Sequence, residues 1–334
     1  MKILIVRFSS IGDIVLTTPI IRCVSEQLPD TEIHFITKKS FQSILQNNPR
    51  IAKLFCIENS IDEVLDDLKK ENYDVIIDLH KNIRTLLLKR KLGVKNYSFP
   101  KLNFQKWLLV NFKRNKMPKQ HVVARYFEAV KEIGVKPDLK NCEYFLAEKD
   151  QVNVFSALGI EPKSYLAVAI GAQFATKVLP IEKMIEILNL IDLPMVLLGG
   201  PTDVEKANQL MEKLGKSKRI VNAVNGFSLN QSASIVSQAK MILTHDTGLM
   251  HIASCFDIPT VSVWGNTVPA LGMYPYFPTN PSQFSVHEVQ NLSCRPCSKI
   301  GHQACPKKHF NCMTLQSSEE IANDVMGRFE EINK

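Results

Sequence analysis

The 334-residue sequence contains no run of eighteen or more apolar residues, although 45% of its residues are hydrophobic. A membrane-spanning helix of ordinary length is therefore not predicted. The apolar run at the start, Met1–Arg7, becomes polar too quickly for a signal peptide and is typical of a buried first strand. We therefore expect a soluble, cytoplasmic protein with enough apolar residues for two domain cores.

Cysteine is too sparse for a disulfide scaffold, because the 334 residues include only eight cysteines. Four of them fall within nineteen residues near the C-terminus, namely Cys294, Cys297, Cys305 and Cys312. Four thiols at this density could hold a structural zinc ion, although their spacing differs from that of a standard zinc ribbon. A loop of reduced or oxidisable thiols is the competing interpretation. Neither interpretation makes the cluster catalytic.

Acidic residues are missing from one long stretch, since no Asp or Glu occurs between Leu79 and Phe127. The same stretch carries thirteen Lys and Arg residues, which exceeds the net charge of +8, so the rest of the chain is net negative. Clustered positive charge attracts a nucleic acid, an anionic membrane or an acidic substrate, whereas a merely solvated surface usually has acidic residues among the basic ones. Within this stretch, residues 104–112 could rest on a bilayer or form an ordinary buried helix.

Short apolar runs alternate with segments of helical spacing along most of the chain. Strands are expected at Ile3–Arg7, Glu32–Ile36, Lys53–Ile57, Asp74–Leu79, Tyr165–Ile170, Met195–Leu198, Arg219–Asn222, Met241–Thr244 and Thr260–Val263. Helices are expected at Ile14–Leu28, Phe41–Gln46, Ile61–Lys70, Ile181–Leu190, Asp203–Leu214, Leu229–Ala239 and Gly248–Cys255. This alternation predicts parallel sheets with right-handed crossovers. We expect two Rossmann-like domains, 1–158 and 159–316, facing one another across a cleft, and a C-terminal helix over 317–334.

The first polar junction follows the first expected strand. Gly12 allows a tight turn there, and Asp13 opens the next helix. Asp13 could be a helix N-cap, which is a common role for aspartate, or a general base that faces the cleft. The absence of G-x-G-x-x-G at this position argues against a dinucleotide oxidoreductase.

The second polar junction leads from a strand into a helix at Asp246, Thr247 and Gly248. Free backbone amides at a helix N-terminus bind anions, and glycine permits close approach of a phosphate. His251 lies one turn further and could reach the same ligand. The combination favours diphosphate binding over the alternative, a capped helix with a buried histidine.

Two further junctions of the second half give weaker signals. Lys177 follows the first strand there and could direct its ammonium group at a phosphate, although most lysines are merely solvated. Asp203 or Glu205 follows Gly199-Gly200 and could bind a ribose diol, or could simply favour the positive end of a helix dipole.

At these residues the sequence resembles glycosyltransferase family 9, the lipopolysaccharide heptosyltransferase family. Two motifs carry the resemblance, Arg7–Pro19 and Asp246–Ala253, with weaker support from Ile77–His80 with Arg84, from Lys177 before Leu179-Pro180, and from the late Cys-x-Pro-Cys region. The resemblance implies a GT-B fold, which consists of two Rossmann-like domains around a central cleft. It also implies an inverting displacement that needs no metal ion or other cofactor.

In that scheme Asp13 takes the proton from the acceptor hydroxyl. The donor diphosphate is held by Asp246, Thr247, Gly248 and His251, with Lys177 neutralising the departing charge and Glu205 as a further donor contact. Members of this family commonly use ADP-heptose and an acceptor built on Kdo and lipid A. The expected acceptor contacts are Ser10, Gly12, Lys81, Arg84 and Arg125. We therefore expect transfer of heptose onto a lipopolysaccharide inner core or a related acidic glycolipid at the inner membrane face.

Other functions remain open at this point. A non-catalytic sugar-nucleotide-binding protein would keep the phosphate site and need no Asp13, and a transferase could use a different nucleotide sugar. Met250 stands where the family often has a small residue, which leaves the donor sugar open. A nucleic-acid-binding protein is disfavoured because neither aromatic stacking motifs nor a recognition helix are recognisable. We expect a monomer with no nucleic-acid partner.

Overall fold

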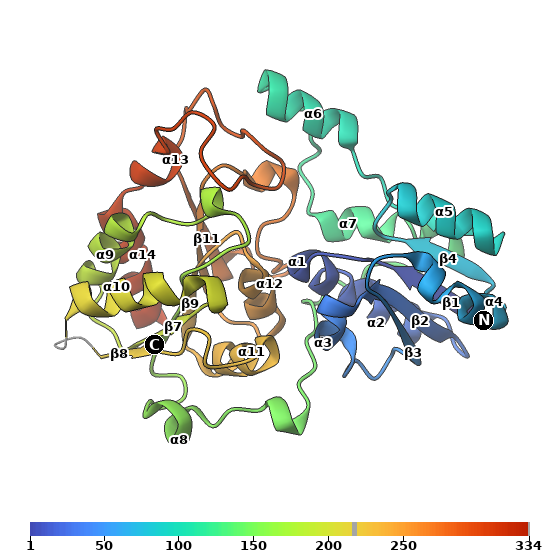
Figure 1. Ribbon diagram of the computed structural model, residues 1–334, viewed down its shortest axis with the longest axis horizontal. Helices are drawn as coiled ribbons and strands as arrows, with labels where there is room; N and C mark the ends of the chain where they lie inside the picture. The colour runs from blue at the N-terminus through green and yellow to red at the C-terminus, as the bar shows by residue number, and fades with distance from the viewer. Residues whose placement is uncertain (216–218, 333–334) are drawn as a thin grey trace. The chain divides into compact units, whose positions relative to one another are not determined.

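The computed structural model describes residues 1–215 and 219–332. The chain forms two compact units, each with one parallel sheet (Figure 1). The first unit comprises residues 1–102 and 120–147, and the second comprises residues 103–119 and everything from Glu148 onward. The second unit therefore begins before the expected boundary at 158/159 and also takes in the segment 103–119. Val154 explains part of this difference, because it is buried in the core of the second unit.

The first unit is built on a five-stranded parallel sheet with the order β3-β2-β1-β4-β5. Its strands are β1 (Lys2–Val6), β2 (Glu32–Lys38), β3 (Lys53–Ile57), β4 (Val75–Asp78) and β5 (Asn96–Ser98). Its helices are α1 (Ile11–Val15), α2 (Thr18–Gln27), α3 (Gln42–Leu45), α4 (Leu65–Lys70), α5 (Ile83–Leu92) and α7 (Val122–Phe127). Leu4 and Val6 pack with α4 and α5 on one face, and Ile3 and Ile5 are buried on the other. Burial on both faces explains why β1 is a continuous apolar run.

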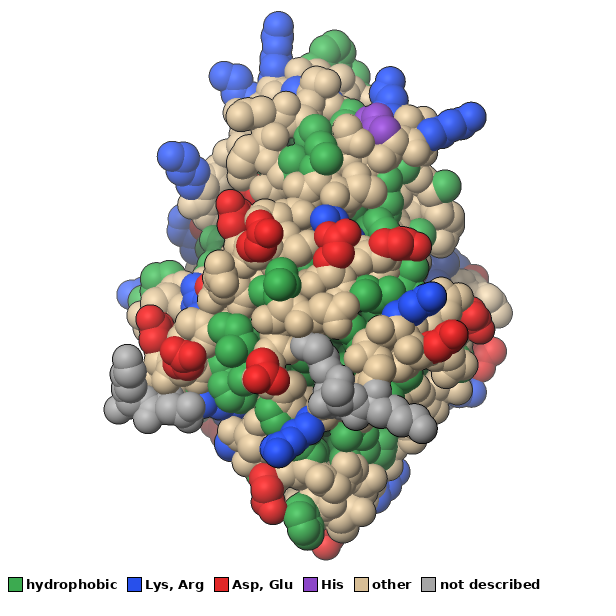
Figure 2. Space-filling model, turned by 90° about the vertical axis from the view of Figure 1, so that its left-hand side faces the viewer, with side chains coloured by type: hydrophobic (Ala, Val, Ile, Leu, Met, Phe, Trp, Pro, Cys, Tyr) green, Lys and Arg blue, Asp and Glu red, His purple; other side chains and the backbone are tan. Residues whose placement is uncertain are grey.

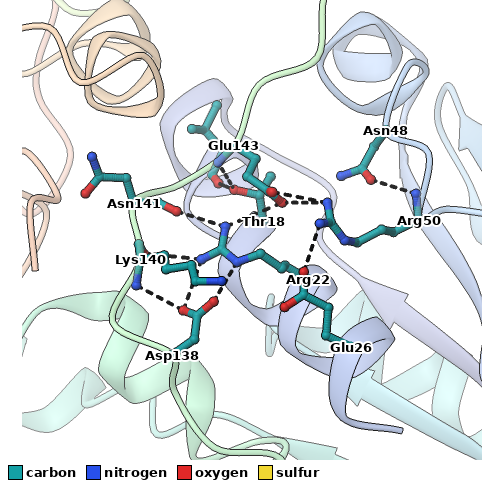
Figure 3. Close-up of polar contacts among 10 residues, drawn as sticks. Thr18, Arg22, Glu26, Asn48, Arg50, Asp138, Lys140, Asn141 and Glu143 are labelled. Carbon is teal, nitrogen blue, oxygen red and sulfur yellow. Dashed lines mark hydrogen bonds and ion pairs between the residues drawn. The ribbon is translucent and has the colours of Figure 1, made fainter. Parts of the chain in front are cut away.

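Buried charge fixes the last segment of the first unit to α2 (Figure 3). The Arg22 guanidinium, which is 3% exposed, binds the Asp138 carboxylate through Nε at 2.7 Å and Nη2 at 3.1 Å. Its Nη1 donates to the Asn141 carbonyl at 2.9 Å. Arg50 reaches Glu143 of the same segment at 3.0 Å. Because a buried guanidinium needs several partners, this network sets the path of residues 138–143.

The second unit is built on a six-stranded parallel sheet with the order β11-β10-β9-β6-β7-β8. Its strands are β6 (Leu166–Ala169), β7 (Met195–Leu198), β8 (Ile220–Asn222), β9 (Met241–His245), β10 (Thr260–Trp264) and β11 (Phe284–Glu288). Its helices are α6 (Asn103–Phe112), α8 (Val154–Leu158), α9 (Ile181–Leu190), α10 (Val204–Leu214), α11 (Leu229–Gln238), α12 (Gly248–Cys255), α13 (Asn311–Thr314) and α14 (Ser318–Glu331). No described helix is both long and apolar enough to span a bilayer.

Helices cover both faces of this second sheet (Figure 1). Leu166 and Val168 of β6 pack with α9, α10 and α14 on one face. The alternate residues Ala167 and Ala169 pack with α11 and α12 on the other face. Ile321 of α14 lies fully buried in the first of these cores. The final helix is therefore part of the second unit rather than a separate element, and Asn333 and Lys334 of the expected 317–334 segment lie outside the described residues.

The expected elements differ from the structure at short or interrupted segments and in the basic stretch, where the ten-residue helix α5 was not expected. The helix expected over Ile14–Leu28 is two helices, because α1 ends at Val15 and α2 starts at Thr18, just before Pro19. Proline is tolerated in the first turn of a helix but not in its interior, so Pro19 favours a new start. The edge strands β5 and β11 were not expected, and both are only partly buried or exposed.

Candidate active site

Each sheet reverses its strand order beside its first strand, between β1 and β4 in the first unit and between β6 and β9 in the second. Ligands of open α/β sheets bind at such switch points, beyond the carboxyl ends of the strands. The polar junctions singled out in the sequence lie there. The Ser9–Asp13 segment follows β1, and the Asp246–Gly248 segment follows β9.

Asp13 is the third residue of α1, and the N-cap position belongs to Ser10. The Ser10 backbone N–H and hydroxyl donate to Asp13 Oδ2 at 3.2 and 2.8 Å. The other carboxylate oxygen, Oδ1, pairs with Arg7 Nη2 at 2.5 Å. Asp13 therefore accepts a hydrogen bond from the N-cap residue of its own helix, yet 23% of its side chain stays exposed. The carboxylate is fixed in orientation and still accessible to another molecule.

Arg7 is the buried partner that keeps this carboxylate in place, with a side chain 9% exposed. Its Nε donates to the Ser9 carbonyl at 2.7 Å and its Nη1 to the Leu79 carbonyl at 2.5 Å. Burial alone would lower the pKa of Arg7, but Asp13, Tyr126 and Asp78 together outweigh it and the pKa is raised. A permanently charged guanidinium favours the ionised form of Asp13, the form that a proton acceptor requires.

His80 follows β4 and lies edge-on to Phe8, with ring centroids 5.2 Å apart. Burial, helped by the positive charges of Arg7 and Lys101, lowers the pKa of His80 to about 4. His80 is therefore neutral near pH 7. The sequence resemblance named His80 only as part of a motif, and its neutral state depends on neighbours that come from distant segments.

A pocket of about 660 Å³ opens in the first unit beside this junction. Its lining includes Ser9, Lys38, His80, Asn82, Arg84 and Lys91. The Arg84 guanidinium lies over the Phe8 ring, 5.5 Å from its centroid, and Lys91 pairs with Asp62. The pocket lining thus combines three cations with one carboxylate, Asp62, and several neutral polar groups. This composition is net positive and suits an acidic ligand. Lys38 and Lys91 were not singled out in the sequence, because neither lies in a motif.

The expected acceptor contacts are distributed unevenly around this pocket. Arg84 lines it, whereas Lys81 is exposed at the end of β4 without being part of its lining. Gly12 is buried and Ser10 bonds to Asp13. Arg125 is fully buried and is not part of the pocket lining, so the structure does not place it at the pocket, and burial lowers its pKa. Its charge acts instead within the first unit, where Tyr126 and Asp13 favour the protonated form.

In the second unit Lys177 and Asp246 form a close ion pair, with Nζ 2.6 Å from Oδ2. Thr267, which follows β10, donates its hydroxyl to the same Oδ2 at 2.8 Å. Lys177 also reaches the Asp246 backbone carbonyl at 3.3 Å. The pair is mostly enclosed, with side chains 16% and 10% exposed. Asp246 is therefore not the helix cap that the sequence suggested, but the residue that fixes the position of the lysine ammonium.

The N-cap of α12 is Thr247, whose side chain makes no capping hydrogen bond among the described residues. Its hydroxyl lies 3.3 Å from the Thr244 hydroxyl instead. The first amides of α12, beginning at Gly248, are therefore left without a side-chain cap. His251 lies one turn further along and is 2% exposed. A lysine ammonium held by the Asp246 carboxylate, two hydroxyls and uncapped amides at one switch point form a candidate anion site.

The candidate ribose acids follow β7. Glu205 is exposed in the first turn of α10 and accepts a hydrogen bond from Gln209 Nε2 at 2.8 Å. Asp203 lies against Gly171, where an added Cβ would come within 2.0 Å of its carboxylate. The Gly200 N–H donates to Asp203 Oδ2 at 2.9 Å. Asp203 is thus occupied by the backbone, and Glu205 is the more accessible of the two acids.

Asn266 was not singled out in the sequence. It follows β10, next to Thr267, and is 1% exposed. Neither its side-chain nitrogen nor its side-chain oxygen has a hydrogen-bond partner among the described residues. Buried amides are nearly always bonded, so an exception beside a candidate site is a candidate ligand contact. Only the fold could reveal this, because an isolated Asn after a strand carries no sequence signal.

The four late cysteines lie near one another without forming a closed set. Burial raises the pKa of the Cys312 thiol to about 12, with further effect from the neighbouring thiols. Cys294 Sγ lies 3.8 Å from His309 Nε2. Within the described residues, however, the only three metal-ligand groups lying within 4.8 Å of one another are Glu32, His34 and Glu71. No three of the four described thiols therefore lie within 4.8 Å of one another, and the zinc ion stays a prediction. Lys2 and Lys53 already pair with Glu71.

Comparison with known proteins identifies the class. The chain superposes on the glycosyltransferase family 9 structure from Veillonella parvula with a TM-score of 0.78, 21% identity and coverage of 99% of this chain and 97% of the other. The Escherichia coli ADP-heptose lipopolysaccharide heptosyltransferase II gives a TM-score of 0.76 at 18% identity, with both chains covered completely. These structures and the two parallel-sheet units show the GT-B fold, as the sequence predicted.

The sequence comparisons agree. Lipopolysaccharide heptosyltransferase 1 of Campylobacter coli is 23% identical over 296 residues, covering 80% of this chain and 84% of that protein. The protein of the same name from Escherichia coli K12 is 25% identical over 301 residues, covering 81% of this chain and 90% of that protein. The family model of glycosyltransferase family 9 (heptosyltransferase) matches residues 62–308. The chain belongs to that family.

Proposed function

We propose that this glycosyltransferase transfers heptose from ADP-heptose, with inversion and without a metal ion, to an acidic glycolipid of the lipopolysaccharide inner core. The observation that carries the proposal is the Asp13 carboxylate. It is fixed by Arg7 and Ser10, remains 23% exposed, and lies at the switch point of the first unit. The names of the relatives supply the donor and the acceptor class.

The proposed donor site is the switch point of the second unit. Amides of Thr247 and Gly248 with the hydroxyls beside them bind the diphosphate, and Lys177 supplies a positive charge held by Asp246 at 2.6 Å. His251 lies within the first turns of the same helix. Glu205 is the proposed ribose contact, and the amide of Asn266 is a further donor contact. Preorganised donors of this kind stabilise the charge that develops on the departing diphosphate.

The proposed reaction is a single displacement. Asp13 accepts the proton of the acceptor hydroxyl while the hydroxyl oxygen bonds to the anomeric carbon of the heptose. The bond from that carbon to the β-phosphate oxygen breaks on the opposite face, and ADP leaves with its charge balanced by Lys177. One carboxylate suffices, because the diphosphate needs charge stabilisation more than protonation. The attack from the opposite face inverts the anomeric configuration.

The proposed acceptor site is the 660 Å³ pocket of the first unit. Lys38, Arg84 and Lys91 give it a positive character, which suits the carboxylates and phosphates of an inner-core glycolipid. Because the proposed acceptor is lipid-anchored, the enzyme would act at the cytoplasmic face of the inner membrane. We also propose that it acts as a monomer. No nucleic acid takes part in this proposal.

A structural zinc ion on the late cysteines stays a prediction, separate from the reaction. Metal analysis of the purified protein tests it directly. One equivalent of zinc that disappears in a Cys294→Ser/Cys297→Ser variant would support the ion. Zinc well below one equivalent would leave the segment as reduced thiols.

The test of the proposed function measures nucleoside diphosphate release with a panel of nucleotide sugars and an inner-core acceptor, in the presence of excess EDTA. We expect release of ADP from ADP-heptose only when acceptor is present, at a rate that EDTA does not change. A different preferred sugar would correct the donor. Binding of ADP-heptose without transfer to any acceptor would point to a non-catalytic sugar-nucleotide-binding protein.

A further inference from the structure

Helix α6 of the second unit exposes an unusual number of aromatic side chains. Phe104, Trp107 and Phe112 are 65%, 50% and 56% exposed. The rings touch one another in sequence, since Phe104 stacks on Trp107 with centroids 6.0 Å apart and Trp107 meets Phe112 edge-on at 5.0 Å. Leu109 is buried and anchors the helix. A contiguous aromatic surface of this kind marks an interaction site, whereas isolated exposed apolar residues do not.

The segment that follows α6 is strongly basic. It carries Lys113, Arg114, Lys116 and Lys119, and no acid occurs anywhere between Leu79 and Phe127. Lys113 ties the segment to the second unit, because its Nζ donates to the Pro296 carbonyl at 2.6 Å. Arg114, Lys116 and Lys119 are exposed, and none of them forms an ion pair within residues 1–215 and 219–332. Their charges are available to an external partner.

Other parts of the second unit's surface do not share this pattern. In the first unit, α5 exposes Ile83, Leu86 and Leu87 beside basic residues, but it presents no aromatic rings. The face drawn in Figure 2 interleaves Asp and Glu with Lys and Arg over its middle and lower parts, as a solvated surface usually does. Large exposed apolar residues elsewhere in the second unit, such as Phe155 and Leu315, lie far from one another in the sequence and in different helices or turns. Within the described part of the second unit, touching exposed aromatic rings occur together with the cations Arg114, Lys116 and Lys119 only in residues 103–119.

We propose that residues 103–119, the α6 surface, dock the enzyme on an anionic lipid bilayer. Aromatic rings partition into the boundary between headgroups and acyl chains, while lysine and arginine lie over anionic headgroups. The inference deepens the proposed function, which requires a lipid-anchored acceptor, by naming the surface that meets the membrane. Charge complementarity identifies the partner as anionic, because a neutral apolar partner would gain nothing from the cations beside the aromatic rings.

A nucleic acid fits the α6 surface less well. Bases bind exposed aromatic faces by stacking, but Phe104 and Trp107 already stack on each other with an interplanar angle of 21°. Binding to an oligonucleotide is therefore an outcome that would contradict the proposal.

The experiment measures cosedimentation of the full chain with vesicles that contain no acceptor glycolipid. One set contains phosphatidylglycerol and phosphatidylcholine, and the other contains phosphatidylcholine alone. We expect binding to the anionic vesicles that weakens with salt, and little binding to the neutral ones. The variant Arg114→Gln/Lys116→Gln/Lys119→Gln should bind roughly a hundredfold more weakly, since each cation contributes about fivefold. The separate variant Phe104→Ser/Trp107→Ser/Phe112→Ser should also lose most of the vesicle binding of the unchanged chain.

A matched control changes Phe155, Ile300 and Leu315 to serine, because these residues have similar exposure in the same unit. It should bind vesicles as the unchanged chain does. Trp107 offers a direct readout, since the other tryptophan, Trp264, is 1% exposed. Its emission should shift to shorter wavelength on anionic vesicles, and Trp107→Phe should abolish the shift.

Transfer to a delipidated, water-soluble acceptor separates this proposal from the proposed function. Both α6 variants should retain that activity while they lose transfer to acceptor in vesicles. Equal vesicle binding by the α6 variants and the unchanged chain would overturn the docking surface, even if the transferase reaction is confirmed. Preferential binding of an oligonucleotide over anionic vesicles would overturn it as well.

Discussion

Each unit has an ion pair between a cationic side chain and a carboxylate at the switch point of its sheet. The two pairs differ in which partner is the more exposed. In the first unit the cation is more buried, with Arg7 9% and Asp13 23% exposed. In the second unit the carboxylate is more buried, with Asp246 10% and Lys177 16% exposed. Thr267 also bonds to Asp246, which leaves the lysine as the outward group. The more exposed partner is therefore a carboxylate at one switch point and a positive charge at the other.

The largest expected effect comes from removing the exposed carboxylate. Asp13→Asn keeps an oxygen for the Ser10 N–H but removes the proton acceptor. We expect the transfer rate to fall about 10²- to 10⁴-fold, the usual contribution of a general base. ADP-heptose affinity, measured by calorimetry, should change little because the donor binds elsewhere. Asp67→Asn is the matched control and should retain full activity, because Asp67 is an exposed carboxylate of the same unit that pairs with Lys70 and does not line the pocket.

Turnover by Asp13→Asn at the unchanged rate would eliminate Asp13 as the base. A parallel loss of ADP affinity would instead show that the two pairs do not have separate roles. Because Asp13 also pairs with buried Arg7, the thermal midpoint of the variant must be measured with the rate. A folded variant with normal donor affinity and no transfer is the diagnostic result.

The second effect in size concerns the exposed cation of the other pair. Lys177→Met removes a charge-assisted hydrogen bond to the donor, which is worth about 1.5–3 kcal/mol, or roughly 10- to 100-fold in affinity for ADP-heptose. Lys177→Arg should recover part of this loss because it retains the charge. Lys183 pairs with exposed Glu186 in the same unit, so Lys183→Met is the control and should bind normally. Normal donor affinity in Lys177→Met would remove Lys177 from the site.

Much of this comparison follows from the sequence, because Arg7–Asp13 and Asp246–His251 are contiguous motifs at strand ends. The β–α alternation also predicts the two parallel sheets. Contacts between distant segments could not be predicted, however. Lys177 meets Asp246 across 69 positions, and the Arg22 network links α2 to residues more than a hundred positions away. The buried state of Arg125 and the orphaned amide of Asn266 depend on packing, which hydrophobic periodicity does not report.

A third prediction compares one histidine of each unit. Burial lowers the pKa of His245 to about 3 and that of His80 to about 4. Unfolded histidine takes up a proton near pH 6.5, so between that pH and the folded pKa the unfolded chain binds more protons. Stability should therefore fall as the pH drops through this window. A pKa difference above one unit amounts to about tenfold or more in the ratio of folded to unfolded protein.

Urea unfolding between pH 4 and 7 measures this dependence. His245→Gln retains an acceptor for the Leu179 N–H, which His245 Nε2 binds at 3.1 Å, and should flatten the pH dependence of the second unit. His80→Gln should flatten that of the first unit over a narrower window, from 6.5 to about 4. Unchanged slopes in both variants would show that neither buried histidine accounts for acid sensitivity.

The smallest expected effect tests whether the second switch point has a ligand contact beyond its ion pair. Asn266→Leu replaces a buried amide without partners by an apolar group of similar size. Because an unsatisfied buried amide costs free energy, the unliganded variant should be as stable as the unchanged chain or more stable. If the amide binds the donor, affinity for ADP-heptose should fall by about 0.5–1.5 kcal/mol, or roughly two- to tenfold. A purely structural asparagine would give a different result. Its replacement would lower the stability and leave the affinity for ADP-heptose unchanged.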